Sequence, residues 1–193
     1  MGSKISIGLV YENKCREDIS VYLEKVINEF LDKGYIKDFT VSLDNEGNEW
    51  IEKNIGEKEV TKTDYDLITT NYYGKINLIS NIITSNPKKI TVAIEKSDEY
   101  FGFLVDLNEE DLTKNFSLDE LENRIVDFLL TKFRILNYDY AFCDNEAEIE
   151  YSPQEIKQEE ELYSLLFIPN TKENKKEIEV KKSSWYIDGL TSR

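Results

Sequence analysis

Two amphipathic segments with helical spacing, set among short runs of alternating apolar residues, most constrain the fold of this 193-residue chain. In the segment from Arg16 to Lys33, one helical face would carry Ile19, Leu23, Val26, Ile27 and Phe30. A second helix is predicted after Ser117, because Ser117 and Glu120 form a capping box. Its buried stripe would be Leu121, Ile125, Phe128, Leu129 and Leu136.

The alternating runs predict strands. Ile5, Ile7 and Leu9 mark the first, and Phe39, Val41 and Leu43 mark a second that ends in a turn at residues 44–47. After Pro87, the runs KKITVAIEK and YFGFLVDL predict a hairpin. Less regular stretches are assigned as follows: 67–70 a strand, 76–83 a strand or short helix, QEIKQEEEL after Pro153 a short acidic helix, YSLLFIP a strand, and 172–182 a charged hairpin or loop.

This order of elements predicts a single globular domain over residues 1–193 of the α+β class. We expect a mixed or mostly antiparallel sheet with two main helices packed on one side, part of it ferredoxin-like. Helices gathered on one face would leave the other face free for a partner, although the late strands could instead build a second layer. The aromatic clusters around Tyr100 and Trp185, and Trp50, are expected to lie in the core.

The amino-acid composition limits the reactions that this chain could catalyse. The chain has no His, which removes the usual general base at neutral pH and the commonest metal ligand, so most hydrolase chemistry is disfavoured. Cys15 and Cys143 are too few for a disulfide framework or a zinc site and are expected to be reduced thiols, with Cys143 buried. No membrane span or secretory leader is recognised, so a cytoplasmic protein is expected.

The chain carries a net charge of −15, which opposes direct binding of nucleic acid or an anionic membrane and favours a basic protein partner. The charge is concentrated in an acidic run at every second position: Asp144, Glu146, Glu148 and Glu150. On a continuous strand these four side chains would share one face with Tyr138, Tyr140 and Phe142. We therefore predict an exposed acidic and aromatic surface for partner binding, made of Asp144, Glu146, Glu148, Glu150, Tyr138 and Tyr140.

Two other interpretations of the acidic run remain open. The turn formers Asp144 and Asn145 could break the segment, which would leave residues 138–142 in the core and the acids on a separate edge strand. A charged edge strand also discourages aggregation without having any partner.

A different function class also remains open, namely a carboxylate-dependent enzyme, either metal-assisted or a glycoside hydrolase. No calcium-type loop, phosphate loop or distinguished carboxylate pair supports it, and no cofactor or metal is expected. An accessory or structural protein with an acidic surface is the third possibility.

In the segments YAFCDNEAEIEYSP and WYIDGLTSR, and in its size and acidity, the chain resembles the small one-domain immunity proteins encoded beside bacterial polymorphic toxins. That resemblance implies a cytosolic inhibitor that binds the catalytic domain of its cognate toxin, often a nuclease, and blocks it sterically or electrostatically. It assigns no role to any single residue. Together with the composition, it predicts an immunity protein that binds a basic toxin domain.

Overall fold

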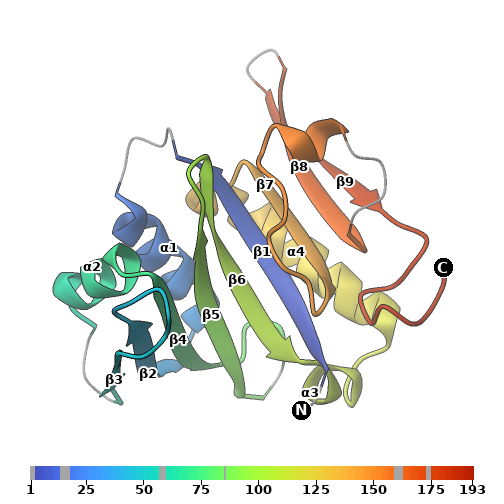
Figure 1. Cartoon of the computed structure of the whole chain (residues 1–193). Helices are drawn as coiled ribbons and strands as arrows, with labels where there is room; N and C mark the ends of the chain where they lie inside the picture. The colour runs from blue at the N-terminus through green and yellow to red at the C-terminus, as the bar shows by residue number, and fades with distance from the viewer. Residues whose placement is uncertain (1–2, 14–17, 57–59, 85, 159–162, 173–174) are drawn as a thin grey trace.

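One antiparallel sheet runs through the molecule (Figure 1). The computed structural model describes residues 3–13, 18–56, 60–84, 86–158, 163–172 and 175–193, and within them the sheet has nine strands. They are β1 (Lys4–Glu12), β2 (Tyr35–Ser42), β3 (Trp50–Asn54), β4 (Tyr73–Ser80), β5 (Lys88–Lys96), β6 (Tyr100–Asn108), β7 (Tyr140–Asn145), β8 (Leu165–Lys172) and β9 (Lys175–Lys182). Their order across the sheet is β3-β2-β4-β5-β6-β1-β7-β8-β9.

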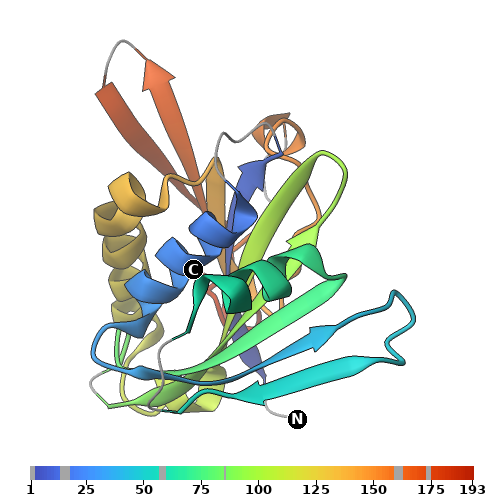
Figure 2. The same ribbon diagram turned by 90° about the vertical axis from the view of Figure 1, so that its left-hand side faces the viewer.

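The helices gather on one face of this sheet (Figure 2). They are α1 (Ile19–Leu31), α2 (Lys62–Thr70), the short α3 (Glu109–Thr113) and α4 (Leu118–Leu136). The apolar stripes predicted for α1 and α4 pack against the sheet in the main core, together with the alternate residues Ile5, Ile7, Leu9 and Tyr11 of β1. The α+β class and the predominance of antiparallel pairing are therefore confirmed. β6, α4 and β7 form a split β-α-β unit, because β1 lies between the two strands.

The prediction of two main helices on that face was wrong, since α2 is a third. Residues 67–70 were predicted to be a strand from their β-branched composition, but they form the last turn of α2. The helix starts with a capping box: the Thr61 hydroxyl accepts a hydrogen bond from the Asp64 backbone N–H, and the Asp64 carboxylate accepts one from the Thr61 backbone N–H. That start signal outweighs the weak strand preference of Ile and Thr.

The edge strand β3 has no counterpart in the sequence-based assignment. All five of its residues are exposed, so the apolar alternation that reveals a half-buried strand is missing. The turn predicted before it is present, and the Asp44 carboxylate accepts hydrogen bonds from the backbone N–H groups of Asn48 and Glu49. β2, the turn and β3 therefore make a hairpin at one edge of the sheet.

A second, smaller core lies on the opposite face, which we call the open sheet face. It is covered by the crossing segment, residues 146–158, which leaves the end of β7 and runs over β1 and β6 (Figure 1). Its members are Val10, Leu104, Tyr140, Phe142, Ile149, Ile156, Tyr163, Leu166 and Ile168. Close approach is possible because Gly8 and Gly102 leave room, the first under the Phe142 ring and the second under Ile149.

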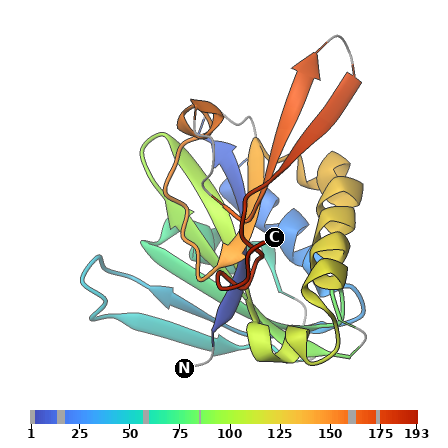
Figure 3. The same ribbon diagram turned by 90° about the vertical axis from the view of Figure 1, so that its right-hand side faces the viewer.

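The remaining predictions have mixed outcomes. The acidic helix after Pro153 is only a 3₁₀ turn at Glu155–Gln158, and its predicted continuation at 159–162 lies outside the described residues. β8 confirms the strand predicted at YSLLFIP, but residues 175–182 of the predicted charged hairpin or loop are one strand, β9, which pairs with β8. Figure 3 shows β8 and β9 extending away from the body of the sheet. Cys143 is buried, as expected, while Cys15 lies outside the described residues.

Substitution Gly8→Ala tests the second core. A Cβ at position 8 would lie 2.0 Å from Cε1 of Phe142, so the ring must move off the sheet. We expect the free energy of unfolding to fall by about 2 kcal/mol, in the range of overpacked cores. In a Phe142→Leu background the same change should cost less, because the smaller side chain can yield. Chemical denaturation of the four chains measures this coupling, and additive effects would contradict the packing described here.

Candidate protein-binding surface

The two tyrosines predicted for the binding surface are buried. Tyr138 is 2% exposed in the main core, where its hydroxyl donates to the Leu129 carbonyl at 3.2 Å. Tyr140 is fully buried in the second core, and its hydroxyl donates to the Tyr151 carbonyl at 2.6 Å. Burial raises the pKa of both phenols. The predicted exposed aromatic patch was therefore wrong, because β7 is covered on both faces.

The acidic run is not a strand ladder either. β7 ends at Asn145, and Glu146 takes a left-handed backbone conformation with φ of 47°. The segment does break, as the alternative interpretation predicted, but the break comes after Asn145 and not at Asp144 and Asn145, and the acids beyond it form no edge strand. Exposed and less exposed residues nevertheless alternate along the first part of the crossing segment. Glu146, Glu148 and Glu150 are exposed there, and Ile149 is buried. We call these three glutamates the acidic display.

Asp144 differs from the acidic display because it holds the structure together. Its carboxylate accepts from the Ser164 backbone N–H at 3.1 Å and lies 2.6 Å from the Ser164 hydroxyl. It also accepts from the backbone N–H of Asn145 at 2.8 Å. These bonds tie the end of β7 to the start of β8, so Asp144 is a structural residue in addition to any contact with a partner.

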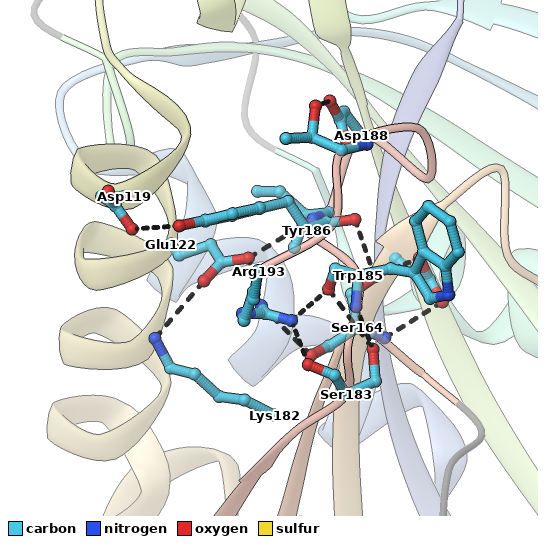
Figure 4. A network of polar contacts seen from close by, with 12 residues as sticks. Asp119, Glu122, Ser164, Lys182, Ser183, Trp185, Tyr186, Asp188 and Arg193 are labelled. Carbon is cyan, nitrogen blue, oxygen red and sulfur yellow. Dashed lines mark hydrogen bonds and ion pairs between the residues drawn. The ribbon is translucent and has the colours of Figure 1, made fainter.

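The C-terminal segment after β9 is held by a polar network around Glu122 of α4 (Figure 4). The Glu122 carboxylate is buried and forms ion pairs with Arg193 and, at 3.3 Å, with Lys182. It also accepts from the backbone N–H of Ile187 at 3.3 Å. The Arg193 guanidinium additionally donates to the carbonyls of Ser183 and Trp185. The network fixes the chain terminus against the helix layer.

Two segments that are distant in sequence meet here. The Ser164 hydroxyl lies within hydrogen-bond distance of both the Asp144 carboxylate and the Tyr186 carbonyl, at 2.6 and 3.0 Å. Gly189 packs on Asn145, where an added Cβ would come within 3.0 Å of the Asn145 Cβ. The end of the YAFCDN strand and the WYIDGL segment therefore support each other.

The C-terminal segment buries Ile187 but leaves two other large apolar side chains exposed. Trp185, expected in the core, is 50% exposed, and Leu190 at the tip of the terminal turn is 81% exposed. That turn is held by the Asp188 carboxylate, which accepts from the backbone N–H groups of Leu190 and Thr191 at 3.0 and 2.9 Å.

An acidic hollow of about 260 Å³ opens beside the acidic display, between the crossing segment and the sheet. Its lining includes Asp106 of β6 together with Glu146 and Glu148. Lys4 partly neutralises it through an ion pair with Asp106 at 3.0 Å, and Ser6 donates to the same carboxylate at 2.8 Å. The surplus of carboxylates makes the hollow attractive to a cation.

Glu95 of β5 extends this negative region. Burial raises the pKa of its carboxyl, and repulsion from Glu148 and Asp106 raises the pKa further. A hydrogen bond from the Ile149 backbone N–H to the carboxylate acts in the opposite direction and lowers the pKa. Glu95 is thus a half-buried acid whose charge is costly in the isolated protein and would be stabilised by a cationic partner.

Sequence reasoning missed a polar row that crosses the open sheet face. One residue from each of seven neighbouring strands stands in register: Asn54, Asp38, Asn77, Thr91, Asp106, Ser6 and Asp144. Within the row, Asn77 donates to Asp38, and Thr91 donates to Asn77 at 3.0 Å. No sequence pattern could have indicated this row, because the row depends on the order of the strands in the sheet, which local patterns do not show.

Neither a metal-binding cluster nor a membrane-spanning helix is found among the described residues. They contain no group of three or more Cys, Asp or Glu side chains placed to hold a metal ion. Among the same residues, no helix is long and apolar enough to span a membrane.

Comparisons with known proteins give one family. A family model described as Immunity protein 64 matches residues 1–193. Among solved structures, a chain of the crystal structure of the toxic C-terminal tip of CdiA from Pseudomonas aeruginosa in complex with an immune protein has a TM-score of 0.44 and 9% sequence identity. The match covers 76% of this chain and 88% of that chain. No curated protein matches.

Substitution Glu95→Gln tests the electrostatics of this surface. The raised pKa means that ionised Glu95 lowers stability, and that this loss develops as the pH rises from 4.5, its ordinary value, through the folded-state pKa. The amide oxygen of Gln can still accept from Ile149. The variant should therefore be more stable than the unaltered chain at pH 7, with a difference that vanishes below pH 4.5. Urea denaturation across this pH range measures the difference in stability. The matched control is Glu24→Gln, at an exposed position of α1. A less stable Glu95→Gln variant at pH 7 would contradict the assignment.

Proposed function

We propose that this chain, which belongs to the Immunity protein 64 family, neutralises a cognate toxin by binding directly to its toxic domain. Family membership supports an immunity role. The observation that carries the binding mode is the acidic display, in which three glutamates project from a segment packed firmly on the sheet. A net charge of −15 adds a long-range attraction for a basic partner.

The partner that fits this surface is a basic catalytic domain, such as that of a nuclease. A domain that acts on nucleic acid presents cationic side chains to phosphate groups. Carboxylates at similar spacing compete for those cations, and the body of the inhibitor then excludes the substrate from the site. Inhibition by this route needs no catalytic group in the immunity protein.

The acidic display is held rigidly, which favours tight binding. Ile149 is buried against Gly102, and the carbonyls of Glu148 and Tyr151 accept hydrogen bonds from Tyr163 and Tyr140. A preordered segment loses little conformational entropy on binding, so more of the interaction energy appears as affinity.

One observation favours a second candidate function, a carboxylate-dependent enzyme. The acidic hollow brings Asp106, Glu146 and Glu148 together beside Glu95, whose pKa is raised. Against this function, Asp106 is already engaged by Lys4 and Ser6. We therefore place it behind toxin binding.

Thermal denaturation with and without a divalent cation separates the two candidates. For a toxin-binding protein, magnesium, manganese and calcium at millimolar concentration should leave the Tm unchanged. A metal bound by the folded state at 100 times its Kd would stabilise it by about 2.7 kcal/mol and raise the Tm by several degrees. Such a rise, lost in a Glu146→Gln and Glu148→Gln double variant, would favour the enzyme.

Reversing the acidic display tests the proposed function. The variant Glu146→Lys, Glu148→Lys, Glu150→Lys should fold normally because all three side chains are exposed. Its association with the purified toxic domain of the cognate toxin should slow by roughly 10-fold or more at low salt, and the rate should depend less on salt. Stopped-flow mixing over a series of salt concentrations measures both effects.

The matched control reverses three exposed acids on the helical elements: Glu24, Glu110 and Asp127. It changes the net charge by the same amount at a different place. If both triple variants slow association equally, only the overall charge matters and the acidic display has no specific role. Unchanged rates in the first variant would remove it from the mechanism.

A further inference from the structure

Part of the open sheet face is not covered by the crossing segment. That segment reaches as far as Gly102 of β6 and Glu95 of β5, and β4, β2 and β3 lie beyond it. Neighbouring strands lie about 4.8 Å apart and these strands are up to about 25 Å long, so the three of them present roughly 15 by 25 Å, or about 375 Å². A typical stable interface buries about 800 Å² on each partner, so this region has about half the size of one binding site and the acidic display adds to it.

An edge hollow of about 460 Å³ lies at the far side of this region. Its lining includes Ser42, Gly47, Trp50, Tyr72, Tyr73 and Lys75. Trp50 and Tyr72 are 51% and 60% exposed, which is unusual for side chains of this size. The hollow is therefore an aromatic site at the edge of an otherwise polar face.

The tryptophan is fixed in place. Its indole N–H donates to the Gly47 carbonyl at 2.6 Å, and its ring meets the Tyr73 ring edge to face at a centroid distance of 6.0 Å. Gly47 itself has φ of 70°, a conformation that suits glycine. Rigid, half-exposed Trp and Tyr side chains are the residue types that most often dominate binding energy, since ordering them costs little entropy.

The edge hollow and the acidic region belong to one continuous surface. Tyr73, which lines the hollow, has a pKa raised by burial and then by the negative charge of Asp106. The charge of Lys4 lowers this pKa and that of Glu95 raises it, so the Tyr73 phenol lies between the edge hollow and the acidic hollow. The polar row contains no apolar side chain of this size, and its members Asp38 and Asn77 are buried and bonded to each other. The surface thus has an aromatic end and an acidic end.

We propose that the uncovered part of the open sheet face docks a basic segment of the toxin, whose apolar side chain enters the edge hollow while its cationic side chains reach the acidic hollow. The occupant follows from charge complementarity: the region beside the crossing segment has more carboxylates than Lys4 can neutralise. This inference rests on the proposed function, because the segment belongs to the toxin. It adds a second contact site that supplies the apolar anchor.

The test uses Trp50→Ala and Tyr72→Ala in the full chain, titrated calorimetrically with the same purified toxic domain. Trp50→Ala should raise the Kd at least about 30-fold and Tyr72→Ala about 10-fold, mainly through faster dissociation. Trp50→Phe should keep most of the affinity. Thermal denaturation confirms folding, and Tyr72→Ala serves as the second probe if the loss of Trp50 disturbs the turn at Gly47.

Trp185→Ala is the matched control, because Trp185 is 50% exposed and belongs to the segment after β9, the edge strand farthest from β3. It should change the Kd less than about 3-fold. Equal losses in the Trp50 and Trp185 variants would overturn the assignment of the edge hollow. If the unaltered chain binds and both edge variants bind equally well, this inference alone fails. If the unaltered chain does not bind, the proposed function fails with it.

Discussion

The packing of Phe142 on the open sheet face determines what the rest of the surface offers. Its ring lies over Gly8 and stacks on Tyr163 with centroids 3.9 Å apart, so the chain on both sides of the crossing segment is anchored to one point. That anchor holds a segment without regular strand structure close enough to the sheet to bury Ile149. The glutamates that alternate with buried residues must then face solvent. The acidic display is a consequence of packing rather than of strand geometry.

The buried carboxylate of Glu122 is a second fixed point, and its role is positional. Arg193 and Lys182 pair with it, yet a buried ion pair contributes little net stability compared with apolar residues of the same shape. Leaving the charge without one of its partners is far more costly, at about 3–5 kcal/mol. The pairing therefore selects one arrangement of the C-terminal segment over others. Through Ser164 it is connected to Asp144, so the end of β7 and the chain terminus are fixed together.

Local patterns predicted the parts of the fold that depend on local physics. The stripes of α1 and α4, the Ser117 capping box and the β5–β6 hairpin follow from spacing and turn chemistry, and all are present. Strand order does not, because it depends on contacts between distant segments. Hence the whole polar row escaped prediction, and the burial of Tyr138 and Tyr140 was only one of two interpretations left open. β3 was missed because an exposed strand has no apolar alternation, and Trp50 was misplaced with it.

On the surface, Glu146, Glu148 and Glu150 are exposed as predicted, but the strand ladder that was expected to expose them is absent. Alternation of Glu146, Glu148 and Glu150 with apolar residues does place them on one side, but through an extended loop and not a ladder. The two exposed aromatic side chains of the edge hollow, Trp50 and Tyr72, lie on β3 and just before β4, six and four strands away from β7 in the order of the sheet. This separation assigns different roles to the two ends of the face. Exposed carboxylates act at long range and chiefly govern the rate of encounter, whereas a seated apolar side chain acts only at contact and governs the rate of dissociation. Salt should therefore weaken the first contribution and leave the second, so an inhibitor with both would keep its toxin bound at ionic strengths that slow the encounter.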